Sequence, residues 1–85
     1  MTLVLLGGLR RFARPAPATA ECVRALLDDS MLPRDLLFPT GDLNRDIEVL
    51  VNGRNIAFLD GMETPLSEDD RVTVFLHGAR GYPGG

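Results

Sequence analysis

The chemistry that this sequence offers is concentrated at its end. The last residues are His77–Gly85, and the final two, Gly84 and Gly85, carry the terminal carboxylate. Because glycine has no Cβ, such a tail can enter a channel too narrow for any other residue and can bend freely there. We therefore predict that the Gly85 carboxylate is the reacting group and that Gly84 gives access to it. The alternative is an ordinary frayed terminus.

The basic residues are consistent with an activated terminus. All nine are arginines, and lysine is absent. If the terminus becomes an acyl donor, side-chain amines would capture it, whereas arginine stays protonated and is a poor nucleophile. A chain without lysine cannot acylate its own side chains. A GC-rich genome that favours arginine codons is the competing explanation.

Length, charge and cysteine content exclude several classes of protein. A chain of 85 residues forms a single domain. Its formal net charge is −3 and its arginines are scattered, which argues against a nucleic-acid partner. One cysteine and one histidine allow neither an intrachain disulfide nor a zinc site. The apolar run Leu3–Leu6 is too short for a signal peptide or a membrane span, so we expect a cytoplasmic protein without a membrane partner.

The first half of the chain predicts a strand followed by a helix. The run Leu3–Leu6 predicts a strand that is central or covered on both faces. Residues Leu9–Arg14 predict either a returning strand or a helical turn. A helix is expected over Ala20–Asp29, with Thr19 as its N-cap and Glu21 in its first turn. Its apolar stripe consists of Cys22, Val23, Leu26 and Leu27.

The second half predicts three short strands. Asp46–Val51 alternates cleanly, and Asn52-Gly53 follows it as a strong hairpin signal. The return strand is expected over Asn55–Leu59, and a last strand over Arg71–His77. Between the helix and these strands, Pro33–Leu37 predicts a short turn. The residues expected to cap the core there are Leu36, Leu37 and Phe38.

One helix cannot cover both faces of a sheet, so one face must stay open or meet a partner. By alternation, Leu50 and Phe75 point away from the inward side chains of their strands. An aromatic side chain exposed on a strand is typical of an interface. We therefore predict that Phe75 and Leu50 bind a partner. The alternative is that the helix packs on their side of the sheet.

Taken in order, these stretches resemble the MoaD/ThiS group of sulfur carriers, which are ubiquitin-like and end in Gly-Gly. The stretches that carry the resemblance are Gly41–Asn44, Ile47–Ile56, Leu59–Leu66, Glu68–Phe75 and Gly84-Gly85. They are closer to the MoaD type than to ThiS. Two features depart from the family pattern. Residues 9–18 are shorter than the usual second strand, and the lead from Leu76 to Pro83 is longer, which leaves the partner enzyme open.

The resemblance implies an α+β fold of the β-grasp type. In this fold one mixed sheet of four to five strands packs on one helix. The expected domain covers residues 1–77, and residues 78–85 are expected to form a flexible tail. The resemblance also implies that the chain is not an enzyme but a protein substrate, binding no cofactor and no metal.

The chemistry that the resemblance implies takes place in partner proteins. An ATP-using adenylyltransferase of the MoeB/ThiF type activates Gly85. A persulfide sulfur, supplied by a sulfurtransferase, then displaces AMP and leaves a thiocarboxylate. The tail delivers this sulfur to an accepting enzyme such as the large subunit of molybdopterin synthase. Arg80 is expected to pair with an acidic rim on the activating enzyme; a solvated charge is the alternative.

Four functions remain open at the level of sequence. The first is a sulfur carrier for molybdenum cofactor synthesis, as the small subunit of molybdopterin synthase. The second is a carrier for tRNA thiolation or for the synthesis of cysteine or another metabolite. The third is a ubiquitin-like modifier that is joined through Gly85 to lysines of target proteins. The fourth is an interaction module with an inert tail.

The remaining residues with chemical potential favour structural roles. Cys22 lies in the helix stripe and is expected to be a small buried apolar residue. His77 ends a strand without a neighbouring nucleophile. The acidic cluster Glu68-Asp69-Asp70 predicts a solvated turn rather than a metal site, because no further carboxylates are spaced to complete a coordination shell.

Overall fold

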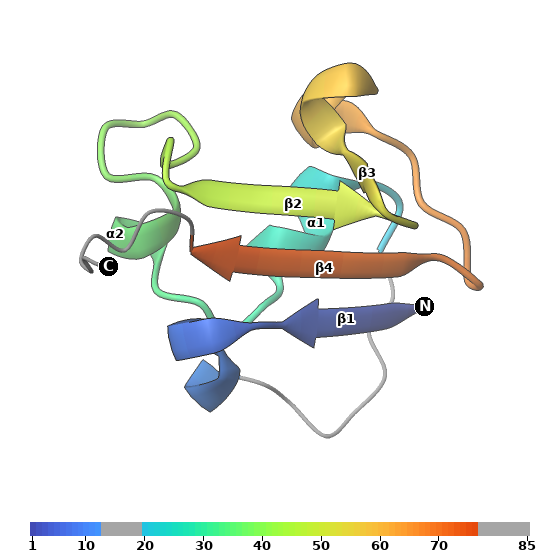
Figure 1. Ribbon diagram of the computed structural model, residues 1–85. Coiled ribbons are helices and arrows are strands. Elements are labelled where there is room, and N and C mark those ends of the chain that lie inside the picture. The colour runs from blue at the N-terminus through green and yellow to red at the C-terminus, as the bar shows by residue number, and fades with distance from the viewer. Residues whose placement is uncertain (13–19, 77–85) are drawn as a thin grey trace.

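The computed structural model describes residues 1–12 and 20–76. Within these residues, four strands form one mixed sheet in the order β1-β4-β2-β3. Their bounds are Thr2–Leu5 for β1, Ile47–Val51 for β2, Arg54–Asn55 for β3 and Arg71–Leu76 for β4. β4 lies parallel to β1 and antiparallel to β2, as Figure 1 shows. The first and last of the described strands are therefore neighbours, with β4 inside the sheet and β1 at its edge.

The helices of the described residues are short. α1 spans Val23–Asp28 and crosses one face of the sheet, and α2 spans Arg34–Leu37 (Figure 1). Three 3-10 helices complete the elements, over Gly7–Phe12, Ile56–Phe58 and Gly61–Glu63. α2 confirms the short turn predicted there. Leu37 is buried, and Leu36 and Phe38 pack against the core as expected.

The core lies between α1 and the sheet. Alternate residues of β2 and β4 are buried, as the period of two in the sequence predicts. Three residues of α1 close the core from the other side. The strand and helix residues concerned are Ile47, Val49, Val51, Val72, Val74, Val23, Leu26 and Leu27. α1 therefore packs on the face of the sheet that the alternation along β2 and β4 predicted to point inward.

β1 lies at an edge of the described sheet, so the prediction of a central strand was wrong. The chain does not return as a strand over residues 7–12 but winds into a 3-10 helix. The Leu9 N–H donates to the Leu6 carbonyl at 3.2 Å, and the Leu9 side chain is buried in the core. The helical alternative for this segment is therefore correct as far as Phe12. Residues 13–19, which include Thr19, lie outside the described residues.

α1 begins at Val23, three residues later than predicted. Cys22 has extended backbone angles and forms an isolated bridge with Pro65. The Val23 N–H donates to the Thr64 carbonyl at 3.1 Å, and the Leu66 N–H donates to the Glu21 carbonyl at 2.9 Å. Glu21 therefore precedes the helix, because its backbone carbonyl pairs with Leu66 in the segment that leads to β4. Cys22 is half-buried at the N-cap rather than buried in the stripe.

The Asn52-Gly53 hairpin is confirmed, but its return strand is shorter than predicted. Asn52 and Gly53 both have positive φ, at 52° and 87°, as a two-residue hairpin turn of the primed type requires. β3 ends at Asn55, because the Asn55 Oδ1 accepts the Ala57 N–H at 2.9 Å and starts a 3-10 helix. This helix turns Ile56 into the core.

A polar bracket joins the β2–β3 turn to the turn before β4. The Asn52 Nδ2 donates to Asp70 Oδ1 at 2.9 Å, and the Arg71 N–H donates to Asn52 Oδ1 at 2.9 Å. The Ser67 N–H donates to Asp70 Oδ2 at 2.7 Å. The Ser67 amide, followed by the Asn52 amide, stabilises the ionised carboxylate and lowers the pKa of Asp70.

We predict that Asp70→Asn reduces the dependence of stability on acid pH. A lowered pKa stabilises the folded state fully above the ordinary value of 3.8, and this stabilisation is lost as pH falls through the lower native pKa. Chemical denaturation of both proteins between about pH 6 and about pH 2 measures the effect. The free energy of unfolding of Asp70→Asn should decline less than that of the unsubstituted chain. Asp69→Asn is the matched control, and an equally reduced decline in that variant would contradict the prediction.

Candidate functional site

The face of the sheet that points away from α1 carries an apolar stripe. We call this the outward face. Its side chains alternate with the buried ones, and they belong to none of the residues packed in the core. The outward residues from β1 across to β2 are Val4, Leu6, Thr73, Phe75, Glu48 and Leu50. This stripe runs over three strands that lie side by side in Figure 1.

The strand register sets the neighbours on this face. Thr73 pairs with Val4 on one side and with Leu50 on the other. Phe75 pairs with Glu48. The Leu6 N–H donates to the Val74 carbonyl at 3.0 Å and extends the β1–β4 pairing by one residue, which places Leu6 beside Phe75. Thr73 therefore has two apolar neighbours, Val4 and Leu50, and Phe75 has one, Leu6.

The outward position predicted for Phe75 and Leu50 is confirmed. Both side chains are half-buried on the face opposite α1. The sequence reasoning missed Val4 and Leu6, because it took their run as covered on both faces. The alternation of side chains along a strand could have revealed them, because Val4 and Leu6 are two positions apart and therefore lie on the same face. Leu6 is the most exposed of these four apolar residues and belongs to the exposed large apolar side chains of the domain.

The rim of the outward face is polar. The Asn55 Nδ2 approaches Glu48 Oε2 at 3.5 Å on the β3 side, which is a weak hydrogen bond. Arg71 lies on the same face at the start of β4 and is exposed. An apolar centre with a polar rim is the arrangement found in protein–protein interfaces.

β4 leads directly from this face to the tail sequence. Its last residue, Leu76, pairs with Ile47, and Phe75 is its last outward residue. The predicted site residues Gly84, Gly85 and Arg80 lie outside the described residues, as does His77. Their roles therefore remain predictions.

Across residues 1–12 and 20–76, no three His, Cys, Asp or Glu side chains cluster in a way that could hold a metal ion. No helix in that same part of the chain is long and apolar enough to cross a membrane. The acidic residues before β4 form a turn, in which Asp70 takes part in the polar bracket.

Comparison with known families settles the class of protein. Residues 3–78 match the ThiS family. The chain belongs to the ThiS family. The resemblance inferred from the sequence is confirmed at this level, and the family comprises ubiquitin-like sulfur carriers and small modifiers. The finer assignment to the MoaD type is not specified by the match.

Two solved structures support the β-grasp fold. The small archaeal modifier protein 1 of Methanosarcina acetivorans superposes with a TM-score of 0.76 and 29% sequence identity, covering 93% of each chain. A chain of the BexX/CysO complex of Amycolatopsis orientalis superposes with a TM-score of 0.74 and 22% identity, covering 88% of this chain and 92% of that one. The predicted α+β fold, with one mixed sheet on a helix, is confirmed.

One curated relative is similar over part of its length. The small archaeal modifier protein 3 of Haloferax volcanii is 44% identical over 39 residues. This match covers 46% of the present chain and 42% of that protein. The chain therefore spans less than half of the length of this relative, and it is the family match that supports the predicted carrier or modifier protein rather than an enzyme.

We predict that threonine at Phe75 and threonine at its neighbour Val74 lower the free energy of unfolding by different amounts, because the two side chains lie on opposite faces of the sheet. Phe75→Thr should lower the free energy of unfolding by about 1 kcal/mol or less, because Phe75 is half-buried and threonine suits a strand. Val74→Thr should lower it by about 2 kcal/mol, because its hydroxyl enters the core without a partner. Denaturant titration measures both. An equal loss in the two variants would place Phe75 in the core.

Proposed function

We propose that the chain is a sulfur carrier whose C-terminal glycine is adenylated and converted to a thiocarboxylate. The observation that carries this proposal is the outward face, an open apolar stripe that includes Phe75 near the end of β4, the strand from which the Gly-Gly tail sequence continues. A partner that binds this face has the start of the tail beside it. Membership of the ThiS family supports the proposal.

The chemistry requires activation because a carboxylate is a poor electrophile. An ATP-using adenylyltransferase of the MoeB/ThiF type joins the Gly85 carboxylate to AMP and releases pyrophosphate. A persulfide sulfur on a sulfurtransferase then attacks the acyl carbon and displaces AMP. A thiocarboxylate results once the sulfur–sulfur bond to that protein is cleaved by a thiol. Gly84 and Gly85 keep the tail slim, and the body of the domain supplies the docking surface.

The outward face accounts for recognition by these partners. Leu6, Phe75, Val4 and Leu50 present apolar side chains that no element of the described residues covers. Burial of such a surface provides affinity in proportion to the apolar area removed from water. Arg80 lies in the tail sequence and would pair with an acidic rim at the mouth of the activating enzyme.

We propose two destinations for the acyl group. The sequence resemblance to MoaD-type proteins favours molybdenum cofactor synthesis, with the chain as the small subunit of molybdopterin synthase. The matches to two small archaeal modifier proteins favour conjugation to target proteins. Both destinations begin with the same adenylation, so the activation step is tested first.

We predict that Gly85→Ala slows activation by about ten-fold or more, the range that one extra methyl group produces in a closely fitted site. The activating enzyme is identified by co-purification from the native cell, and AMP formation is then measured with the purified pair. Gly81→Ala is the matched control and should be activated at nearly the normal rate, because it is four positions from Gly85 in the sequence. Normal adenylation and thiolation of Gly85→Ala would refute the proposal.

The intact mass of the chain from its native cell separates the destinations. A carrier should gain the mass difference of one sulfur in place of one oxygen. A modifier should appear in addition as a ladder of larger conjugates that share its tail. Neither signal would be expected of an inert module, and that result would contradict both destinations. Co-purification of a large synthase subunit would favour the molybdenum cofactor.

A further inference from the structure

Phe58 is the most exposed large apolar side chain in the described residues. It is 86% exposed, compared with 59% for Met31 and 43% for Leu6. Its position is fixed by the backbone beneath it. The Leu59 N–H donates to the Ile56 carbonyl at 2.9 Å, and the Ile56 side chain is buried. A well-anchored 3-10 helix therefore holds an aromatic ring in solvent.

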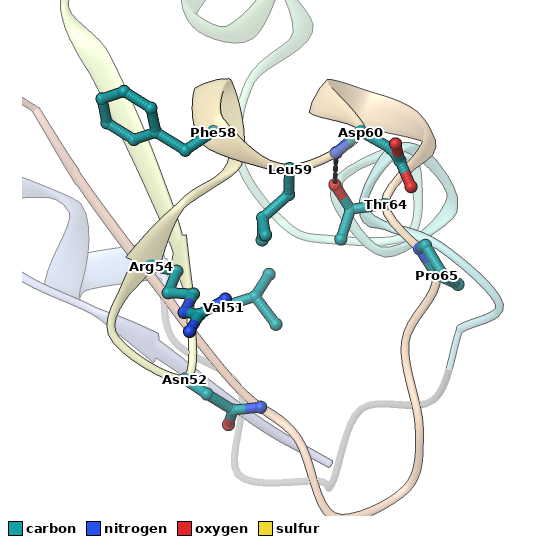
Figure 2. Close-up of a pocket in the computed structure, with 8 residues that line it drawn as sticks. All are labelled: Val51, Asn52, Arg54, Phe58, Leu59, Asp60, Thr64 and Pro65. Carbon is teal, nitrogen blue, oxygen red and sulfur yellow. Dashed lines mark hydrogen bonds between the residues drawn. The ribbon is translucent and has the colours of Figure 1, made fainter.

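A shallow hollow of about 600 Å³ lies beside Phe58 (Figure 2). We call it the Phe58 hollow. The residues that line it are Val51, Asn52, Arg54, Phe58, Leu59, Asp60, Thr64 and Pro65. The side chains of Val51 and Leu59 point into it in Figure 2. Val51 belongs to the core and Leu59 packs against the core. An apolar group that enters the hollow would therefore extend the core outward.

Two opposite charges lie on opposite sides of the Phe58 hollow. Figure 2 shows Arg54 on the side of Phe58, and Asp60 on the side of Pro65. Neither side chain forms an ion pair within residues 1–12 and 20–76, where the ion pairs are Arg24–Glu63 and Arg34–Asp28. Asp60 is exposed, and its bond to Thr64 Oγ1, at 3.1 Å, is made by its backbone N–H rather than by its carboxylate.

The Phe58 hollow is separate from the outward face. The Val51 side chain points to the core side of the sheet, away from Leu50. Val51 pairs with Val72 near the start of β4, whereas the tail sequence continues from the other end of that strand, where Leu76 pairs with Ile47. A molecule in the hollow therefore leaves the outward face and the end of β4 accessible.

We propose that the Phe58 hollow binds an extended segment of a second protein. This segment carries a bulky apolar side chain that packs against Phe58, Val51 and Leu59. An acidic residue on one side of the apolar group pairs with Arg54, and a basic residue on the other side pairs with Asp60. The two charges fix the orientation of the segment, and the exposed ring beside an arginine provides the residue types that dominate binding energy in protein interfaces.

The openness of the site favours a protein segment over a small molecule. Small-molecule sites enclose most of the ligand surface, whereas this hollow is shallow and has an aromatic ring standing at its rim. A protein segment can cover both the floor and the ring. Such binding goes beyond the chemistry of the tail and does not depend on Gly85.

Titration of the isotope-labelled full chain with defined peptides, followed by NMR, tests this inference. The probes are the capped peptides Gly-Glu-Leu-Leu-Lys-Gly and Gly-Lys-Leu-Leu-Glu-Gly, which offer the charges in both chain directions. One of them should bind with a dissociation constant of about 1 mM or below. It should shift the amide signals of Val51, Arg54 and Leu59 and leave those of Thr73 and Phe75 unchanged. Replacing both leucines of the peptide with alanine should abolish these shifts.

Variants of the chain identify the contacts. Phe58→Ala and Arg54→Glu should each weaken binding by about ten-fold, a change typical of a central interface residue. Met31→Ala and Arg45→Glu are matched controls at exposed positions outside the hollow, and they should bind normally. A peptide with lysine in place of its glutamate should recover affinity for Arg54→Glu.

Three outcomes would overturn the inference. The first is the absence of shifts for both peptides at about 10 mM, a concentration at which even weak specific binding is visible. The second is a set of shifts centred on the outward face instead. The third is that, in the absence of peptide, the amide signals at the hollow shift as the concentration of the chain increases. That result would show that a second copy of the chain covers Phe58.

Discussion

Among the described residues, one short helix, α1, crosses a sheet of four strands, and the rest of the structure depends on this imbalance. α1 and the inward residues of β2 and β4 form a single core with buried valine and leucine side chains. Nothing in the described residues packs on the opposite face, so its apolar side chains stay half-exposed. The sheet and α1 form two layers, and a third layer would be needed to cover the opposite face.

The segment that crosses from β3 to β4 holds the helix and sheet together. Thr64 is the buried polar residue of the core region, and its hydroxyl donates to the Gly61 carbonyl at 2.7 Å while accepting the Asp60 N–H. The same segment pairs with Glu21 and Cys22, and Arg24 on α1 reaches Glu63 at 2.7 Å. These contacts connect the start of α1 to the end of the hairpin. They also form one wall of the Phe58 hollow.

The molecule therefore presents two surfaces with different neighbours. The outward face adjoins the end of β4, where the tail sequence begins, and is the surface that we propose for a partner acting on the terminus. The Phe58 hollow lies towards the other end of the β2–β4 pair and opens on the core side. A carrier that passes between proteins benefits from two such surfaces, because one partner can hold it while another acts on its tail.

The sequence by itself determined much of the fold and of the candidate site. The alternation over residues 46–51 and 71–76 fixed two strands and placed Phe75 and Leu50 outward, because side chains in a strand alternate strictly between faces. The Asn52-Gly53 pair fixed the hairpin, since both positions need positive φ. The ordered stretches and the terminal glycines indicated the MoaD/ThiS group, which the match to the ThiS family confirms. The closer likeness to the MoaD type stays a prediction. These features are local, so local patterns were sufficient to find them.

Only the tertiary structure decided the features that depend on distant partners. α1 starts at Val23 rather than at the predicted Ala20, because Cys22 pairs with Pro65. β1 is an edge strand, because the residues that follow it form a 3-10 helix instead of a neighbouring strand. The exposure of Leu6 and Phe58 was likewise set by what packs beside them. Hydrogen bonds and packing between segments far apart in the chain carry no local signal. That is why the sequence predicted the strands and the outward position of Phe75 and Leu50, whereas the place of Val4 and Leu6 on the outward face and the Phe58 hollow became visible only in the folded domain.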